Sequence, residues 1–100
     1  MTHVPEMNDI TLDFSGIPSL REVEVRCRSA SLKRAEEIDA LPFREGMRVF
    51  LDEIVKSWNF TDKSDEPIPV TLDELEKMPP WVAMTMKNAW TTGLLTAPKD

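Results

Sequence analysis

The 100-residue chain is poor in the residues that most catalytic, metal-binding and phosphate-binding sites require. It has one histidine, one cysteine and three glycines. His3 lies in a terminal segment with little to bury, so a His-dependent triad or a histidine metal site has no scaffold. Gly16, Gly46 and Gly93 are too far apart for a glycine-rich phosphate loop. We therefore assign no catalytic, metal-binding or cofactor-binding residue, and we predict a protein that is not an enzyme and uses no cofactor.

A single cysteine also excludes an intramolecular disulfide. Cys27 alternates with Val23 and Val25, which is the pattern of a small buried hydrophobic side chain in a strand. A reactive Cys27 would need an exposed site and a basic partner. Burial is the simpler interpretation, and the cysteine usage favours a cytoplasmic protein.

Long apolar runs and excess positive charge are missing as well. The longest unbroken apolar run is residues 81–84, and residues 1–9 hold no apolar stretch of signal-peptide length. We expect neither a signal peptide nor a membrane span. The net charge of −6 disfavours a protein that binds nucleic acid through phosphate contacts. The basic residues that do cluster are interpreted as a solvated face: Arg21, Arg26, Arg28, Lys33 and Arg34.

The apolar spacing predicts a mainly helical α+β fold. Apolar and polar residues alternate in residues 10–14 and again in residues 23–27, which predicts an N-terminal β-hairpin that packs on a small bundle of about four helices. The length suits one domain. We expect this domain to span residues 10–93, with flexible tails at residues 1–9 and 94–100.

The first two helices are predicted from a cap and from a long apolar stripe. Ser31 is a suitable N-cap for a helix through Asp39 that has Leu32, Ala35 and Ile38 on one apolar side. A second helix is expected to begin at Pro42 and to continue as far as the end of one apolar stripe at helical spacing. That stripe consists of Phe43, Met47, Phe50, Leu51, Ile54, Val55 and Trp58.

The last two helices are predicted from capping residues and prolines. Thr71 and Glu74 form a capping-box pattern at the start of a short helix that stops at Pro79. Pro80 begins the final helix, for which Gly93 is the expected C-terminal cap.

Residues 58–71 join these two halves and form a polar turn between aromatic residues and an alternating Pro-apolar segment. Pro67 and Pro69 fix φ and lack amide donors, so residues 67–70 are expected to be extended. Trp58 and Phe60 are interpreted as core residues at the end of the long helix. The calcium-loop-like spacing of polar residues ahead of Pro67 is interpreted as a solvated turn, because such a loop needs glycine at that position; these residues are Asp62, Ser64 and Glu66.

This arrangement of a helix ending in WNFTD, a short polar insert, EPIPVT and a capped helix resembles the tail assembly chaperones of long-tailed (siphovirus-type) phages and prophages, particularly those of actinobacterial hosts. Residues 10–92 can be laid along the plan of that family. The resemblance implies a non-catalytic protein that binds the tape measure protein, keeps it soluble and helps to recruit tail tube subunits. It also implies a location in the host-cell cytoplasm and absence from the mature virion.

The final helix is apolar on two opposite sides, which suggests where a partner binds. The denser side is assigned to the core and consists of Val82, Met86, Ala89 and Trp90. The sparser side and the residues that follow it supply the predicted partner-binding residues, Trp81, Met84, Leu94 and Leu95. Two alternatives stay open: a second copy of this chain on that side, and a generic cytoplasmic adaptor that binds one partner through this helix.

Overall fold

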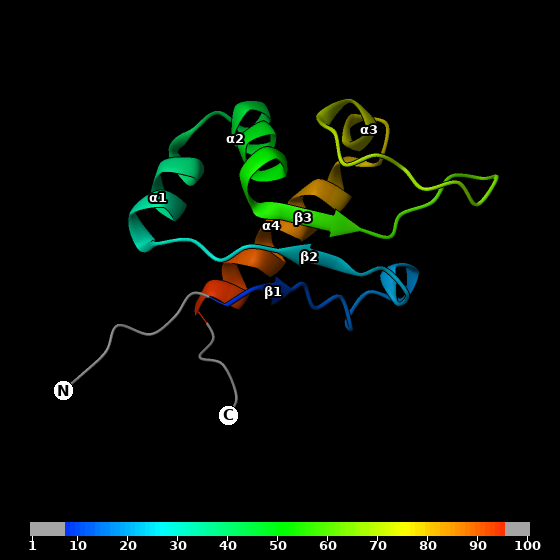
Figure 1. The fold of residues 1–100 in the computed structure, drawn as a ribbon, viewed down its shortest axis with the longest axis horizontal. Coiled ribbons are helices and arrows are strands. Elements are labelled where there is room, and N and C mark those ends of the chain that lie inside the picture. The colour runs from blue at the N-terminus through cyan, green and yellow to red at the C-terminus, as the bar shows by residue number, and fades with distance from the viewer. Residues whose placement is uncertain (1–7, 96–100) are drawn as a thin grey trace.

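The computed structural model describes residues 8–95, which form a small antiparallel sheet covered by helices (Figure 1). In Figure 1, α4 crosses behind the three strands, and α1 and α2 lie on the β3 side of the sheet. The predicted class, a mainly helical α+β fold, is confirmed. The elements are β1 (Ile10–Thr11), the 3-10 turn η1 (Pro18–Leu20), β2 (Val25–Cys27), α1 (Leu32–Ala40), α2 (Phe43–Val49), the π-helical turn η2 (Phe50–Ile54), β3 (Val55–Trp58), α3 (Leu72–Glu76) and α4 (Pro80–Leu95).

The sheet has the order β1-β2-β3, with both strand pairs antiparallel. The predicted hairpin is therefore present, but a third strand extends it. Cys27 lies opposite Ile10 on one side and opposite Val55 on the other. The alternation in β2 works as expected, since Val25 and Cys27 are fully buried and Arg26 faces solvent.

The predicted long helix is wrong after Ile54. α2 passes into the π-helical turn η2, and Val55 then adopts extended angles (φ −72°, ψ 120°) and begins β3. Strand pairing explains the change, because residues 55–58 complete a ladder with β2, and the Arg28 amide donates to the Ile54 carbonyl at 2.7 Å. Pro42 is also one residue outside α2, with a non-helical ψ of 148°.

Both predicted N-caps are confirmed. The Ser31 hydroxyl accepts a hydrogen bond from the backbone N–H three residues later at 3.1 Å, and the Thr71 hydroxyl accepts one from the Glu74 amide at 3.2 Å. Only half of the capping box forms, since the Glu74 carboxylate pairs with Lys77 at 3.1 Å. Each helix start thus has one of its free amide donors satisfied by a side chain.

Gly93 is not a helix cap, which corrects the predicted end of α4. The helix continues to Leu95, and Gly93 has no positive φ. A Cβ at this position would lie 2.6 Å from Cγ2 of Ile10, so glycine allows α4 to approach β1 closely. Leu94 and Leu95 are helical, and the remainder of the predicted C-terminal tail lies outside the described residues, as do residues 1–7 of the N-terminal one.

The core lies between the sheet and the helices and is centred on Trp90. The Trp90 indole N–H donates to the backbone carbonyl of Arg28 at 3.0 Å, and the ring meets Phe50 edge-to-face at a centroid distance of 5.5 Å. The largest fully buried side chains are Trp90, Phe50, Ile38, Met47, Met86, Val25 and Cys27. Among residues 8–95, no helix has the length and apolar character needed to cross a membrane.

Residues 60–68 form a small hairpin that projects away from the body of the molecule (Figure 1). Asp62 organises its turn, because its Oδ1 accepts backbone N–H bonds from Ser64 at 2.8 Å and from Glu66 at 3.1 Å. Asp65 adopts a positive φ of 61°, a conformation in which aspartate is tolerated. The polar spacing therefore serves the turn.

Trp58 and Phe60 attach this hairpin to the sheet, and do not seal the end of a long helix as predicted. Their rings meet edge-to-face at 5.2 Å, and the Trp58 indole N–H donates to the Ile68 carbonyl at 2.6 Å. Both side chains are half-buried. The extended course predicted for residues 67–70 begins with a bridge between Thr61 and Pro67.

Candidate partner-binding surface

The structure buries the denser side of α4 and exposes the sparser one. Val82, Met86 and Trp90 are buried, and Ala89 is half-buried, as the sequence predicts. On the other side, the exposed fractions are 43% for Trp81, 55% for Met84 and 81% for Leu95, whereas Leu94 is half-buried against the core. The binding of a partner by these four residues stays a prediction.

Two further apolar side chains are exposed that the sequence placed in buried stripes. Leu32 is 75% exposed and Phe43 is 51% exposed, so their predicted burial is wrong. At about 100° per residue, Leu32 points about 120° away from Ile38, the buried residue of α1. Phe43 occupies the first turn of α2, before the residues that reach the core. The sequence spacing between Leu32 and Ile38 already gives this angle around the helix axis, so the exposure of Leu32 could have been predicted.

Four of the exposed apolar residues, all except Trp81, line adjoining hollows. A cavity of about 270 Å³ between α1 and α4 has Leu32, Trp90 and Leu95 among its lining residues. A second, of about 300 Å³, is lined by Phe43 and Met84. The two cavities share three lining residues, Asp39, Lys87 and Thr91. We call these two cavities together the α1–α4 groove.

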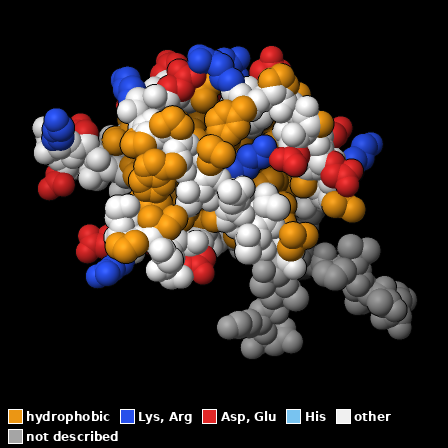
Figure 2. All heavy atoms as spheres, turned by 180° about the vertical axis from the view of Figure 1, so that it is seen from behind, with side chains coloured by type: hydrophobic (Ala, Val, Ile, Leu, Met, Phe, Trp, Pro, Cys, Tyr) orange, Lys and Arg blue, Asp and Glu red, His pale blue; other side chains and the backbone are white. Residues whose placement is uncertain are grey.

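A third hollow adjoins the groove at Phe43. This cavity of about 420 Å³ lies between α2, α3 and the start of α4, and apolar side chains such as Met47, Leu75 and Met78 line it. Arg44 and Glu76 form an ion pair of 2.7 Å among its lining residues. On the face that α4 occupies, apolar side chains gather over much of the surface (Figure 2). Such extended apolar exposure is typical of interaction surfaces.

One ion pair crosses the α1–α4 groove. Lys87 Nζ lies 2.9 Å from Asp39 Oδ1; the Lys87 side chain is only 17% exposed, whereas that of Asp39 is 74% exposed. Lys87 is the one cation that lines the groove within the described part of the chain. This ion pair was not predicted, because Asp39 and Lys87 share no local sequence pattern.

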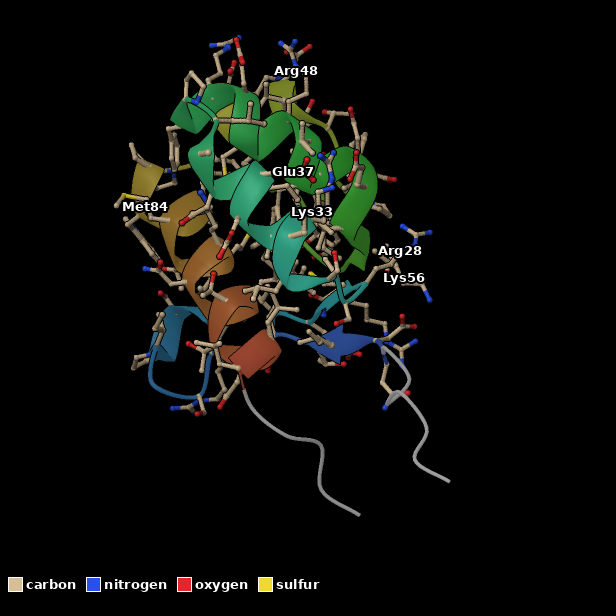
Figure 3. All side chains as sticks on the ribbon, turned by 90° about the vertical axis from the view of Figure 1, so that its left-hand side faces the viewer. Arg28, Lys33, Glu37, Arg48, Lys56 and Met84 are labelled. Carbon is tan, nitrogen blue, oxygen red and sulfur yellow. The ribbon has the colours of Figure 1, made fainter. Side chains whose placement is uncertain are left out.

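Several other charged groups form ion pairs at the surface outside the groove. Arg34 Nε donates to Glu53 Oε2 at 2.9 Å, and this hydrogen bond holds the pKa of the Glu53 carboxyl below its usual value. In Figure 3, Arg28 and Lys56 lie on the opposite side of the molecule from Met84. Lys56 pairs with Asp9 at 2.6 Å. Two members of the predicted basic cluster have acidic partners at the surface, since Arg34 pairs with Glu53 and Arg26 Nε lies 3.5 Å from Glu24 Oε1.

The nucleophile and metal-ligand chemistry of the described residues is limited. Cys27 is fully buried, and burial raises the pKa of its thiol to about 12, so the thiolate is scarce at neutral pH. Within residues 8–95, no three His, Cys, Asp or Glu side chains are placed to hold one metal ion. The feature with the clearest binding capacity is therefore the exposed apolar surface.

Comparison of the chain with protein-family models, with curated proteins and with solved structures found no match. The interpretation of the surface consequently rests on its own geometry.

Proposed function

We propose that this protein is a non-catalytic tail assembly chaperone that binds the tape measure protein in the host-cell cytoplasm and helps to recruit tail tube subunits. The observation that carries the proposal is the placement of the five large apolar side chains that are exposed within residues 8–95. Trp81 and Met84 share the outer side of α4, and Met84 also lines the α1–α4 groove together with the remaining three. The other three are Leu32, Phe43 and Leu95.

The shape of this surface supports the binding of helices. The two cavities of the groove lie between α1 and α4, and grooves between helices receive the apolar face of an amphipathic helix in many complexes. Methionine suits a surface that meets a changing series of side chains, because it repacks easily. Tryptophan adds a large contact area at a low cost in conformational entropy.

The segment that carries the family resemblance folds as a strand, a hairpin and a capped helix. WNFTD ends β3 and enters the hairpin, and EPIPVT leads to Thr71 at the start of α3. The net charge of −6 would keep complexes with many bound copies soluble and mutually repulsive. These features agree with a chaperone that coats a long partner.

Co-expression tests this function. The expected gene neighbourhood has a tube protein gene just upstream of the gene for this chain and a gene for a very long helical protein just downstream, and that long protein is the partner to co-express. We expect the wild-type chain to keep this protein in the soluble fraction, and the Trp81→Ala/Met84→Ser variant to lose this ability because it loses apolar contact area. The melting temperature of the variant should stay nearly unchanged, since both side chains are exposed.

Arg48→Ala provides the control, because Arg48 is exposed on α2 and lines none of the three hollows. It should behave as the wild type. Equal solubility of the long protein with and without the chain would contradict the proposal. A variant that unfolds while it still protects the partner would show that the two sides of α4 are assigned the wrong way round.

A generic cytoplasmic adaptor is the alternative, and the same α4 surface allows it. Stoichiometry separates the two functions. A chaperone of a long helical protein binds in many copies along it, whereas an adaptor forms a complex of fixed, low stoichiometry with one globular partner. Light scattering of the purified complex measures the copy number directly.

A further inference from the structure

The α1–α4 groove is apolar at both ends and charged at its centre. Leu32 and Leu95 lie at one end, and Phe43 and Met84 lie at the other. Lys87 lines both cavities and reaches Asp39 across the groove. Met84 and Leu95 are eleven positions apart on α4, which corresponds to about 16 Å along the helix axis. An occupant of the whole groove must therefore cover about three helical turns and meet a cation at its middle.

The ammonium group of Lys87 has hydrogen-bonding capacity left over. A lysine ammonium carries three donors, and Asp39 Oδ1 is its one ion-pair partner among the described residues. The Lys87 side chain is already mostly buried, so a partner lying over the groove would remove its remaining water. A purely apolar partner would then leave donors without acceptors, which costs free energy.

A carboxylate in the partner avoids this loss. It would share the ammonium with Asp39, whose exposed side chain can move aside or hold the far side of the cation. Glu36 lies in the cavity toward Leu32 and would repel an acid placed at that end of the groove. The charges therefore favour an acid opposite Lys87 and apolar side chains on both sides of it.

We propose that the α1–α4 groove binds an amphipathic α-helix that carries apolar side chains in successive turns and one carboxylate between them, with the carboxylate paired to Lys87. This inference rests on the proposed function, because it names the kind of tape measure segment that the surface selects. Lys87 is then a specificity-determining residue, and the flanking cavities supply most of the contact area.

Three synthetic helical peptides of about 18 residues test the proposal. They carry leucines in their first and last turns and neutral polar residues on their other sides, and they differ only in a central glutamate, glutamine or lysine on the leucine side. Calorimetric titration of the full chain at low salt should give the tightest binding for glutamate, about fivefold weaker binding for glutamine and the weakest for lysine. The preference should shrink as the salt concentration rises.

Lys87→Met should abolish the preference for glutamate while keeping the binding of the glutamine peptide. Lys33→Met is the matched control, since Lys33 is exposed on α1 and lines neither cavity (Figure 3). This control should keep the preference. Asp39→Asn should widen the gap between glutamate and glutamine, because the competing carboxylate is gone.

The outcomes separate this inference from the function on which it rests. Equal binding of all three peptides, with loss of binding in Trp81→Ala/Met84→Ser, would overturn the role of Lys87 and leave helix capture intact. No binding of any peptide would overturn the inference, while the co-expression experiment decides the function separately. Sedimentation of the chain alone completes the test, because a dimer that excludes the peptides and survives Lys87→Met would assign the groove to a second copy.

Discussion

At Gly93, the missing side chain determines how closely α4 approaches β1. Glycine inside a helix normally lowers stability by about 1 kcal/mol relative to alanine. Here a Cβ would meet Ile10 Cγ2 at 2.6 Å, which is too close for two carbon atoms. The Ile10 methyl group is attached directly to Cβ and cannot swing away without a rotamer change. The glycine therefore serves packing and not a turn.

We predict that Gly93→Ala lowers the free energy of unfolding by about 1 to 2 kcal/mol, because overpacking outweighs the gain in helix propensity. In an Ile10→Ala background the clash is absent, and the same substitution should raise stability by up to about 1 kcal/mol. Urea denaturation of the four proteins measures this coupling. Equal effects of Gly93→Ala in both backgrounds would show that the close approach does not limit packing.

Some residue-scale features were predictable because their causes are local. Ser31 and Thr71 cap helices through hydrogen bonds to amides three residues later, and Cys27 is buried by simple alternation. The exposure of Leu32 was not predicted, because its apolar side chain was given more weight than its angular distance from Ile38 around the axis of a short helix. The prediction that Gly93 caps α4 was also wrong, because the close contact that requires glycine there comes from Ile10, near the other end of the chain.

Among the elements, residues 43–58 show the limit of periodicity. Phe50, Leu51, Ile54 and Val55 are all buried, which fits one helical stripe. The chain nevertheless changes from helix to strand between Ile54 and Val55. The decisive interaction is the ladder to β2, and no short sequence window contains both partners. Tertiary pairing therefore overrides a local pattern that suits either element.

The buried side chains of the π-helical turn η2 should nevertheless contribute strongly to the stability of the core. We predict that Leu51→Ala and Ile54→Ala each cost about 2 to 5 kcal/mol, as expected for buried large-to-small changes. Asp52→Ala should cost little, because Asp52 is exposed. Chemical denaturation of the three variants checks this difference. Small and equal losses would mean that η2 does not hold its side chains in the core.

One part of the candidate surface could be predicted from a single helix, and the other part could not. The two apolar sides of α4 indicated Trp81, Met84 and Leu95 as exposed residues, because helical geometry fixes angles within one element. The α1–α4 groove was not predictable, since Asp39 and Lys87 come from opposite halves of the chain and meet only in the folded protein. Neither residue belongs to a recognisable motif.

Across the whole molecule, β2 is the strand that connects the parts of the core. It is the central strand of the sheet, and the carbonyl of Arg28, just after its end, accepts the Trp90 indole N–H from α4. Cys27 lies within this strand and is fully buried. Exposure of its thiol therefore requires the sheet and α4 to separate, which makes Cys27 a reporter of opening of the entire fold.

The thiol also links overall stability to alkaline pH. Burial raises the pKa of Cys27 from 9.0 to about 12 in the folded state. Because the folded pKa is higher than the unfolded one, the stabilisation is fully present below pH 9.0 and is lost as the pH rises toward about 12. In that interval the unfolded chain releases the thiol proton and the folded chain keeps it.

We predict that the urea midpoint of the wild type falls more steeply between about pH 9 and pH 12 than that of Cys27→Val, which keeps an apolar side chain in the strand but cannot ionise. Lysine ionisation affects both proteins alike, so the difference in slope isolates the cysteine. At neutral pH, a thiol-specific reagent should label the wild type only as fast as the fold opens, and urea should accelerate labelling in step with unfolding. Rapid labelling without urea, together with parallel pH profiles, would mean that β2 opens independently of α4 and that the core is not one cooperative unit.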